Sequence, residues 1–190
     1  QRIVEIRQEV AGYFKPYDHI YDPLLDMFDP GMKTADVKQI FNALRPRQVE
    51  LIKAISQSKQ VDNSFLKKNY DKALQEKFGR HVISRFGYDW NRGRLDVTPH
   101  PFTTGFGLGD IRITTRYLDN DGTSALFGTM HESGHAMYSQ GCNKIYARTV
   151  LQEVSSLSFH ESQSRLWENL VGRSKEFWIY FYPGFQMLFS

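Results

Sequence analysis

The sequence predicts a mainly α-helical protein with one small β-sheet. Apolar residues recur at helical spacing over most of the 190 residues, whereas residues 94–117 alternate and are rich in β-branched side chains. A third observation places the sheet in context. His131-Glu132-Ser133-Gly134-His135 has the form HExxH and lies in an apolar stretch that is typical of a helix. We therefore expect a helical core with a small β-sheet beside a zinc site at this motif.

The N-terminal half is predicted to consist of helices. Residues 3–14 are predicted to be the end of a helix, residues 74–86 have helical spacing, and Thr34 has a side chain that favours a helix start. Pro46 is expected to end the helix that follows Thr34 or to begin the next one. Three apolar stripes are predicted to face the core, and they comprise Val37, Ile40, Phe41 and Leu44, then Val49, Ile52 and Ile55, then Leu74, Phe78, Val82 and Phe86.

Two short strands are expected at residues 95–98 and 111–117, where apolar and polar residues alternate. The glycine-rich segment 103–109 lies between them. It contains no lysine and does not continue as GK[ST], so it is not a phosphate-binding loop. We predict that it is a mobile turn.

The HExxH motif predicts a metal site. Residues i and i+4 of a helix share one face, so the imidazoles of His131 and His135 can reach one ion. Glu132 lies about 100° around the helix from His131 and is free to act as a base. The alternative is a solvated helix with two surface histidines. The small and apolar neighbours favour a buried helix and therefore the metal site, and they are Leu126, Phe127, Met130, Gly134, Ala136 and Met137.

Glu161 is the candidate for a third ligand. A catalytic zinc ion usually has three protein ligands and one open position. Residues 154–171 are predicted to form an amphipathic helix, and a turn at residues 141–144 would bring Glu161 back to the histidines. Glu153 and Glu168 are rival ligands, and a surface salt bridge is the ordinary role of such a glutamate.

Four motifs in this order resemble those of the carboxypeptidase Taq family of zinc metallocarboxypeptidases. They are His100-Pro101-Phe102, Asp110-Ile111-Arg112-Ile113-Thr114, the HExxH motif and His160-Glu161-Ser162-Gln163. The resemblance implies a mostly helical metallopeptidase that removes single residues from peptide C-termini. It further implies one zinc ion, for which cobalt can substitute, on His131, His135 and Glu161. Glu132 would be the general base, and the protein would often be a homodimer.

Other residues near these motifs have candidate roles around the metal, of which only the place of His100 comes from the resemblance. His100 is expected near the active site, where it can donate a hydrogen bond to the oxyanion or to the leaving amine. His160 either supports a metal ligand or belongs to the core. Asp110 can orient a metal-bound imidazole, and Arg112 can pair with Asp110 or bind a substrate carboxylate. We expect Ile111–Thr115 to bind a peptide as an added strand.

Residues 1–190 are expected to be a single catalytic-core region of a longer metallocarboxypeptidase, truncated at both ends. Two further family motifs, IRxxAD and GxxQDxHW, are absent, and the arginine of the first is thought to bind the substrate's terminal carboxylate. The aromatic residues between 177 and 189 would form a large exposed patch, which favours contact with a homodimer partner or with the remainder of a full-length chain. Two alternatives remain, a zinc endopeptidase or oligopeptidase and an inactive metal-binding fragment of a larger assembly.

Composition excludes several other classes. The formal net charge is only +3, from 24 Lys and Arg against 21 Asp and Glu, so we expect no nucleic-acid partner. No apolar run is long enough to span a bilayer, so we expect no membrane partner either. Cys142 is the single cysteine, which excludes an internal disulfide and fits a reducing compartment. We therefore expect a cytoplasmic enzyme that acts on peptides.

Overall fold

The computed structural model describes residues 1–152 and 156–189, which form two compact units. The first unit contains residues 1–62 and 156–158, and the second contains the other described residues. Most elements are helices, and one three-stranded sheet accompanies them, so the predicted fold class is confirmed. No helix in the described ranges is long and apolar enough to cross a membrane.

The first unit contains the helices α1 (Arg2–Gly12), α2 (Asp22–Asp26) and α3 (Thr34–Gln57). The carboxylate of Asp22 joins α2 to the start of α3. Its Oδ1 accepts a hydrogen bond from the backbone N–H of Thr34 at 2.8 Å, and its Oδ2 accepts one from the N–H of His19 at 3.0 Å. Asp22 therefore satisfies one of the N–H groups that a helix leaves unpaired at its first turn.

Helix α3 differs from the prediction in two ways. It continues through Pro46, so the expected helix boundary there is wrong. Proline removes one N–H and pushes away the carbonyl four residues earlier, and here that carbonyl belongs to the exposed Asn42, where water can satisfy it. The apolar stripe of α3 is not core, since Phe41 is 61% exposed and Ile52 is 64% exposed. Helical spacing identifies an apolar face but does not say what covers it.

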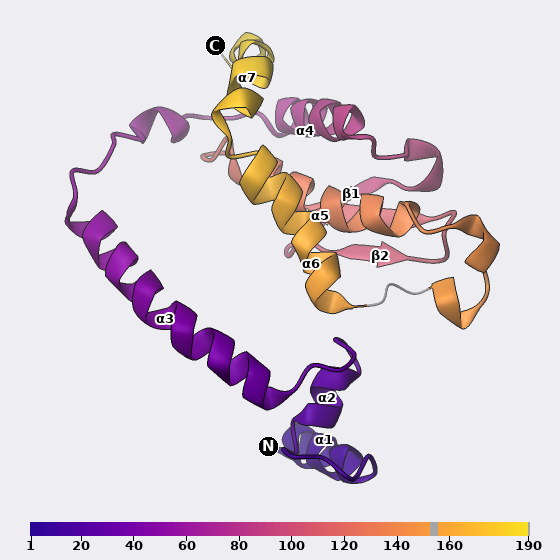
Figure 1. The fold of residues 1–190 in the computed structure, drawn as a ribbon. Helices are drawn as coiled ribbons and strands as arrows, with labels where there is room; N and C mark the ends of the chain where they lie inside the picture. Colours follow the sequence, from indigo (N-terminus) through magenta and orange to yellow (C-terminus); the bar gives the residue numbers. More distant parts are fainter. Residues whose placement is uncertain (153–155, 190) are drawn as a thin grey trace. The chain divides into compact units, whose positions relative to one another are not determined.

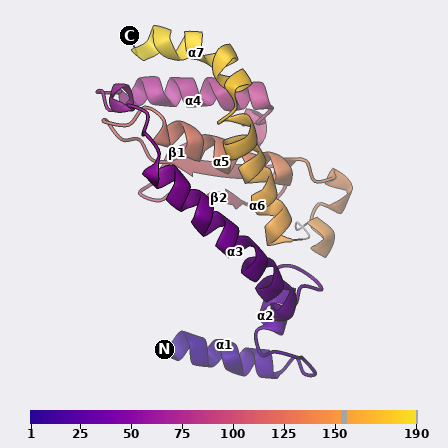
Figure 2. The same ribbon diagram turned by 60° about the vertical axis from the view of Figure 1, so that its left-hand side comes forward.

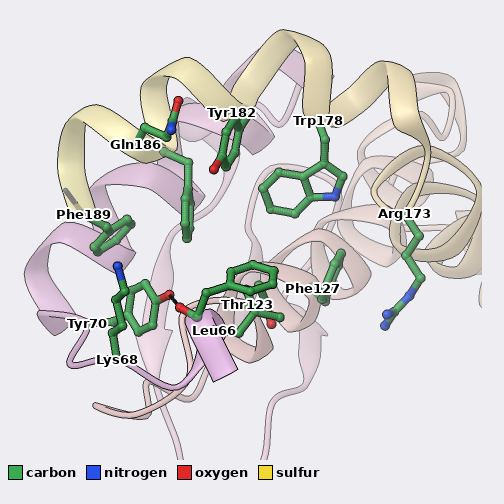
Figure 3. A pocket seen from close by; sticks show the side chains of 12 residues that line it. Leu66, Lys68, Tyr70, Thr123, Phe127, Arg173, Trp178, Tyr182, Gln186 and Phe189 are labelled. Carbon is green, nitrogen blue, oxygen red and sulfur yellow. Dashed lines mark hydrogen bonds between the residues drawn. The ribbon is translucent and has the colours of Figure 1, made fainter. Parts of the chain in front are cut away.

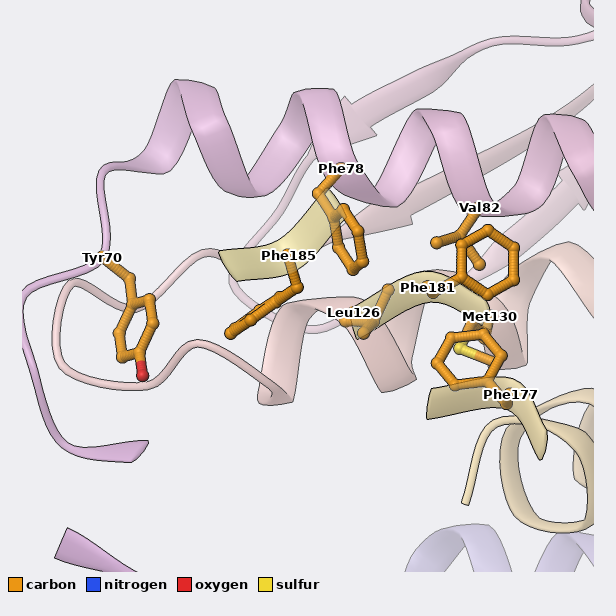
Figure 4. Packing of buried hydrophobic residues seen from close by; sticks show 8 residues of the cluster. All are labelled: Tyr70, Phe78, Val82, Leu126, Met130, Phe177, Phe181 and Phe185. Carbon is orange, nitrogen blue, oxygen red and sulfur yellow. The ribbon is translucent and has the colours of Figure 1, made fainter. Parts of the chain in front are cut away.

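Three helices of the second unit share one apolar core: α4 (Lys72–Phe86), α5 (Ser124–Gln140) and α7 (Lys175–Phe189) (Figures 1 and 2). The α4 helix begins at Asp71, whose side chain accepts a hydrogen bond from the N–H of Leu74, and ends at Gly87 with a φ of 109°. Figure 4 shows the buried cluster between the helices, made of Tyr70, Phe78, Val82, Leu126, Met130, Phe177, Phe181 and Phe185.

The aromatic segment of α7 is largely part of this core. Phe177, Phe181 and Phe185 recur every four residues, so they share one face, and each is at most 7% exposed. The expectation that the aromatic residues of this segment form a large exposed patch is therefore wrong for this face. The other face of α7 remains exposed, with Ile179 at 66% and Met187 at 81%.

The sheet has the order β1-β3-β2, with β1 (Leu95–Val97), β2 (Thr103–Gly105) and β3 (Ile111–Thr115). Strand β3 pairs in parallel with β1 and antiparallel with β2. Part of the predicted mobile turn therefore forms the edge strand β2. Because β3 is paired on both sides, the expectation that Ile111–Thr115 adds a peptide strand is wrong. Alternation identifies a strand but not its place in the sheet.

The inner face of the sheet is held against the helices by a second buried cluster. Helix α5 contacts β3 and α4 directly. The side chain of Ile113 is fully buried, and the cluster around it comprises Ile83, Tyr88, Ile111, Ile113 and Ala136. This packing fixes the sheet along the helix that carries the HExxH motif.

The last helical segment before α7 is divided into α6 (Leu157–Arg165) and a π-helical turn, η5 (Leu166–Val171). A single helix over residues 154–171 was expected, and residues 153–155 lie outside the described residues. The remaining elements are short 3₁₀ turns, namely η1 (Ser64–Leu66), η2 (Trp90–Arg92), η3 (Lys144–Tyr146) and η4 (Val150–Gln152).

Candidate metal centre

Helices α5 and α6 bring three predicted ligands together. Glu161 Oε2 lies 3.2 Å from Nε2 of His135 and 3.6 Å from Nε2 of His131. One ligand atom from each of these three residues lies within 4.8 Å of the other two. Two imidazole nitrogens and one carboxylate oxygen at this spacing form a donor set that suits zinc.

The close approach of α6 to α5 depends on Gly134, inside the HExxH motif. A Cβ atom on Gly134 would lie 2.6 Å from the Cα of Ser164 and 2.7 Å from the carbonyl oxygen of Gln163. Only glycine leaves room for the backbone of α6 at this point. Its place in the motif therefore sets the distance at which Glu161 faces the two histidines.

The protonation of the donors also fits a metal. Burial lowers the pKa of His135, and the neighbouring His131 lowers it further, so the neutral imidazole is favoured. Burial alone would raise the pKa of Glu161, but the hydrogen bond from Arg165 and the proximity of His131 outweigh burial and lower it. Metal ligands must be deprotonated, and both shifts act in that direction.

The outer nitrogens of both histidines are hydrogen-bonded. Nδ1 of His131 lies 2.9 Å from Oε2 of Glu168, and Nδ1 of His135 lies 2.5 Å from Nδ1 of His160. Nε2 of His160 in turn lies 3.3 Å from the hydroxyl of Ser139. Partners at Nδ1 leave Nε2 of each imidazole facing the cluster.

This geometry bears on the rival ligands. Glu168 contacts the side of His131 that faces away from Glu161, so its carboxylate does not join the three-atom cluster. The hydrogen bonds from Arg173 and His131 lower the pKa of Glu168 against the opposing effect of burial. Glu153 lies outside the described residues.

Glu132 lies beside the cluster and is only 7% exposed. The hydroxyl of Thr103 on β2 donates a hydrogen bond to Oε2 of Glu132 at 2.6 Å and also lies 3.0 Å from its backbone oxygen. Burial raises the pKa of Glu132, and the Thr103 hydroxyl offsets part of that increase. A carboxylate with a raised pKa is suited to accept and return a proton near neutral pH.

The motifs at residues 100–102 and 110–114 are hydrogen-bonded to each other within the sheet, beside the centre. The N–H of Phe102 donates to the Thr114 hydroxyl at 2.8 Å, and the N–H of Thr114 donates to the Phe102 carbonyl at 2.9 Å. These bonds tie the His100 loop to β3. His100 is exposed, yet it is close enough to Glu132 for its electrostatic interaction to lower the pKa of that carboxyl.

Asp110 and Arg112 are paired with each other. The guanidinium donates from Nε to Oδ1 at 2.9 Å and from Nη2 to Oδ2 at 2.7 Å, and this pairing lowers the pKa of Asp110. Arg112 also lies over the Phe106 ring, 5.0 Å from its centroid. In the described parts of the chain, the partners at Nδ1 of the two candidate ligand imidazoles are Glu168 and His160, so Asp110 does not orient either ring. A substrate-binding role for Asp110 and Arg112 stays a prediction.

Two cavities flank these elements. One of about 190 Å³ is lined by β2, Leu108, Ser139 and His160, so it adjoins the metal centre. The other, of about 820 Å³, is lined mainly by aromatic side chains, with Lys68 and Arg173 at its wall (Figure 3). None of the three candidate ligands lines this wider cavity.

Sequence reasoning did not identify three of these polar contacts. Thr103 carries no signal of its own, because a threonine next to glycines predicts only a turn. Ser139 follows His135 by four residues, a helical spacing that could have placed it on the same face. Arg165 follows Glu161 by four residues and Glu168 follows it by seven. Helical spacing could therefore have placed these three side chains on one face as well.

The sequence was compared with known proteins and solved structures. The family model described as carboxypeptidase Taq (M32) metallopeptidase matches residues 1–190. The chain is 38% identical to Carboxypeptidase 1 of Bacillus subtilis (strain 168) over 187 residues, which cover 98% of this chain and 37% of that protein. It is 43% identical to Thermostable carboxypeptidase 1 of Thermus thermophilus over 176 residues, which cover 92% of this chain and 34% of that protein.

A solved structure shows the same fold. The M32 carboxypeptidase from Deinococcus radiodurans R1 superposes with a TM-score of 0.96 at 40% identity, over 99% of this chain and 38% of that one. The chain thus spans between 34% and 37% of the length of these two curated relatives.

Proposed function

Because the chain belongs to the carboxypeptidase Taq (M32) metallopeptidase family, we propose that it is the catalytic core of a zinc-dependent carboxypeptidase that releases single residues from peptide C-termini. The ligands in this proposal are His131, His135 and Glu161, and cobalt can replace zinc. Glu132 is the general base. The protein is a cytoplasmic hydrolase.

One observation carries the proposal. Three donor atoms converge within 4.8 Å of one another, next to a buried glutamate that is not one of them. A structural zinc site usually closes its coordination with four protein ligands, whereas a hydrolytic site has three and leaves one position open. A basic carboxylate beside an open position is the arrangement that water activation requires.

A bound zinc ion supplies Lewis-acid chemistry, which polarises the scissile carbonyl and makes water more acidic. Glu132 accepts the proton of the attacking water and delivers it to the leaving amine. Since Thr103 occupies Oε2, we assign the proton transfer to Oε1. His100, near Glu132, donates a hydrogen bond to the developing oxyanion or to the leaving amine.

The peptide is proposed to lie along β2, which is an edge strand and holds Thr103 against Glu132. The cavity of about 190 Å³ next to His160 would then accept one substrate side chain. Arg112 and Asp110 are proposed to contact the substrate beyond it. His160 supports His135 through its hydrogen bond. The protein partner is a second copy of this chain or the remainder of a longer chain.

The test uses one peptide in two forms, with a free and with an amidated C-terminus. The zinc-loaded full chain is incubated with each form, and the products are identified by mass spectrometry. Successive single-residue losses from the free form alone support the carboxypeptidase. Internal cuts in both forms contradict it in favour of an endopeptidase, and zinc binding without any cleavage contradicts it in favour of a metal-binding fragment.

A further inference from the structure

Glu168 contacts the metal centre without belonging to the donor set. Its Oε2 accepts the hydrogen bond from Nδ1 of His131 at 2.9 Å, while Nε2 of the same ring faces Glu161. An imidazole has one N–H when it is neutral, so an acceptor at Nδ1 leaves the lone pair on Nε2. The position of Glu168 thus determines which nitrogen of His131 faces the cluster.

Two arginines hold this carboxylate in place. Nη2 of Arg173 lies 2.9 Å from Oε1 of Glu168, and Nη1 of Arg165 lies 3.2 Å from Oε2. The Glu168 side chain is 13% exposed, whereas Arg173 is 50% and Arg165 is 56% exposed, so the carboxylate is buried beneath two half-exposed guanidinium groups. Arg165 also donates from Nε to Oε1 of Glu161 at 2.7 Å. One guanidinium therefore links the candidate ligand Glu161 to the acceptor of His131.

The backbone at Glu168 is also fixed. It lies in the π-helical turn η5, where the N–H of Gly172 bonds to the carbonyl of Trp167 at 2.9 Å. The Trp167 ring stacks on Phe86 with 4.3 Å between centroids. Gly172 lies against Met130, the residue before His131, and a Cβ there would be 2.3 Å from the Met130 Cε. The turn is thereby packed against the helix that carries the histidines, and π turns occur frequently at functional sites.

We propose that Glu168 is a positioning residue that fixes His131 with Nε2 toward the metal, and that Arg165 couples this carboxylate to Glu161. The inference rests on the proposed function, because it takes His131 as a ligand. Carboxylates behind a ligand histidine orient its ring and raise its basicity, and their loss typically lowers metal affinity about 10–100-fold.

The experiment measures zinc affinity of the full chain by competition with a chelator. Glu168→Ala is expected to bind zinc about 10–100-fold more weakly than the wild type. Glu168→Gln retains an acceptor oxygen but no charge, so its affinity is expected between the two. Glu176→Gln, an exposed change on α7, is the matched control and is expected to bind zinc as the wild type does.

A second readout follows the ring itself. In the zinc-loaded wild type, the Nδ1–H proton of His131 is expected as a strongly downfield-shifted NMR signal, which moves upfield in Glu168→Gln. Equal affinity in Glu168→Ala and the wild type, or an unshifted signal in Glu168→Gln, would overturn the inference. If His131→Ala also binds zinc normally, the proposed function has failed instead, so the two failures are distinguishable.

Discussion

Some residues at the centre face the three-atom cluster, and others hydrogen-bond to those residues and hold them in position. Glu132 differs from its neighbours because its carboxylate is buried yet is not among the three converging donors. Thr103 contacts it from β2, and Glu168 contacts His131 from η5. Each proposed chemical role therefore depends on a partner from a different element.

Replacing Glu132 by glutamine tests the proposed base. The amide is almost isosteric but cannot accept the proton, so turnover is expected to fall by about 10²- to 10⁴-fold. Zinc content should be unchanged, because Glu132 is not a donor. Peptide hydrolysis and metal content are measured on the same sample. Full turnover in Glu132→Gln would show that another group is the base.

That His131 and His135 share one helix face was predictable because helix geometry is regular, whereas the preference for Glu161 over Glu153 and Glu168 came from the family resemblance. His131 and His135 are four residues apart on one helix, and the structure brings Glu161 to both. The residues that hydrogen-bond to these side chains could be predicted only in part. Glu168 was considered as a rival ligand, but it contacts Nδ1 of His131, the nitrogen that faces away from the cluster. Its spacing of seven residues from Glu161 predicts a shared helix face but not how far its carboxylate reaches toward the cluster. Thr103 could not be predicted, since its contact with Glu132 depends on how the sheet packs.

At the level of elements, the centre depends on how closely α6 lies to α5. Gly134→Ala would place a Cβ 2.6 Å from the Ser164 backbone, so the helices must separate. We expect a loss of about 1–3 kcal/mol in the free energy of unfolding, as for other overpacked sites, together with weaker zinc binding. Thermal unfolding and chelator competition measure the two effects.

Gly128 in the same helix provides the matched control. Its added Cβ would meet only side-chain atoms at 3.8 Å or more, namely the Thr115 hydroxyl and the Pro101 ring. Alanine favours the helix over glycine by up to about 1 kcal/mol, so Gly128→Ala should leave stability equal or higher and zinc affinity unchanged. If both variants behaved alike, close helix packing would not be what positions Glu161.

The stability of the protein is expected to depend on alkaline pH through Tyr88, which follows α4 and contacts the sheet. Tyr88 is 3% exposed, and its hydroxyl donates to the Ile111 carbonyl at 2.8 Å. Burial, with the nearby Asp110, raises the pKa of Tyr88 to about 12 from 10.0. The unfolded chain loses this proton at lower pH than the folded chain, so stability is complete below pH 10 and falls as the pH rises toward 12.

The contribution of Tyr88 to that decline is about 2 kcal/mol by pH 12. Chemical unfolding at several pH values should show a less steep alkaline loss in Tyr88→Phe than in the wild type. The variant should also be about 1 kcal/mol less stable at neutral pH, because the hydrogen bond to Ile111 is lost. An identical pH slope in both proteins would mean that the Tyr88 proton is not linked to folding.

Element types were more predictable than their boundaries and surroundings. The helices and two strands follow from apolar periodicity, but β2 was expected as a turn, because Thr103-Thr104-Gly105 has no alternating pattern. It is a strand because β3 offers it a hydrogen-bonding edge. The break at Pro46 was also wrongly expected, as was the exposure of the α7 face that carries Phe177, Phe181 and Phe185, since both depend on what surrounds each helix.

At the scale of the whole molecule, the second unit contains every candidate ligand and its hydrogen-bond partners. The sheet, α5, α6 and η5 all contribute residues to one centre, whereas the chain spans only 34% to 37% of two curated relatives. That residues 1–190 act as a single catalytic-core region stays a prediction. The property to test on this part of the chain alone is its specificity as a carboxypeptidase.

The most direct measurement is an anomalous difference map at the zinc absorption edge, from crystals of the full chain grown with zinc. We expect one peak bonded to Nε2 of His131, Nε2 of His135 and an oxygen of Glu161, at about 2.0–2.2 Å. Glu168 should remain hydrogen-bonded to Nδ1 of His131. A peak held by other residues, or no peak between these three side chains, would contradict the proposed metal centre.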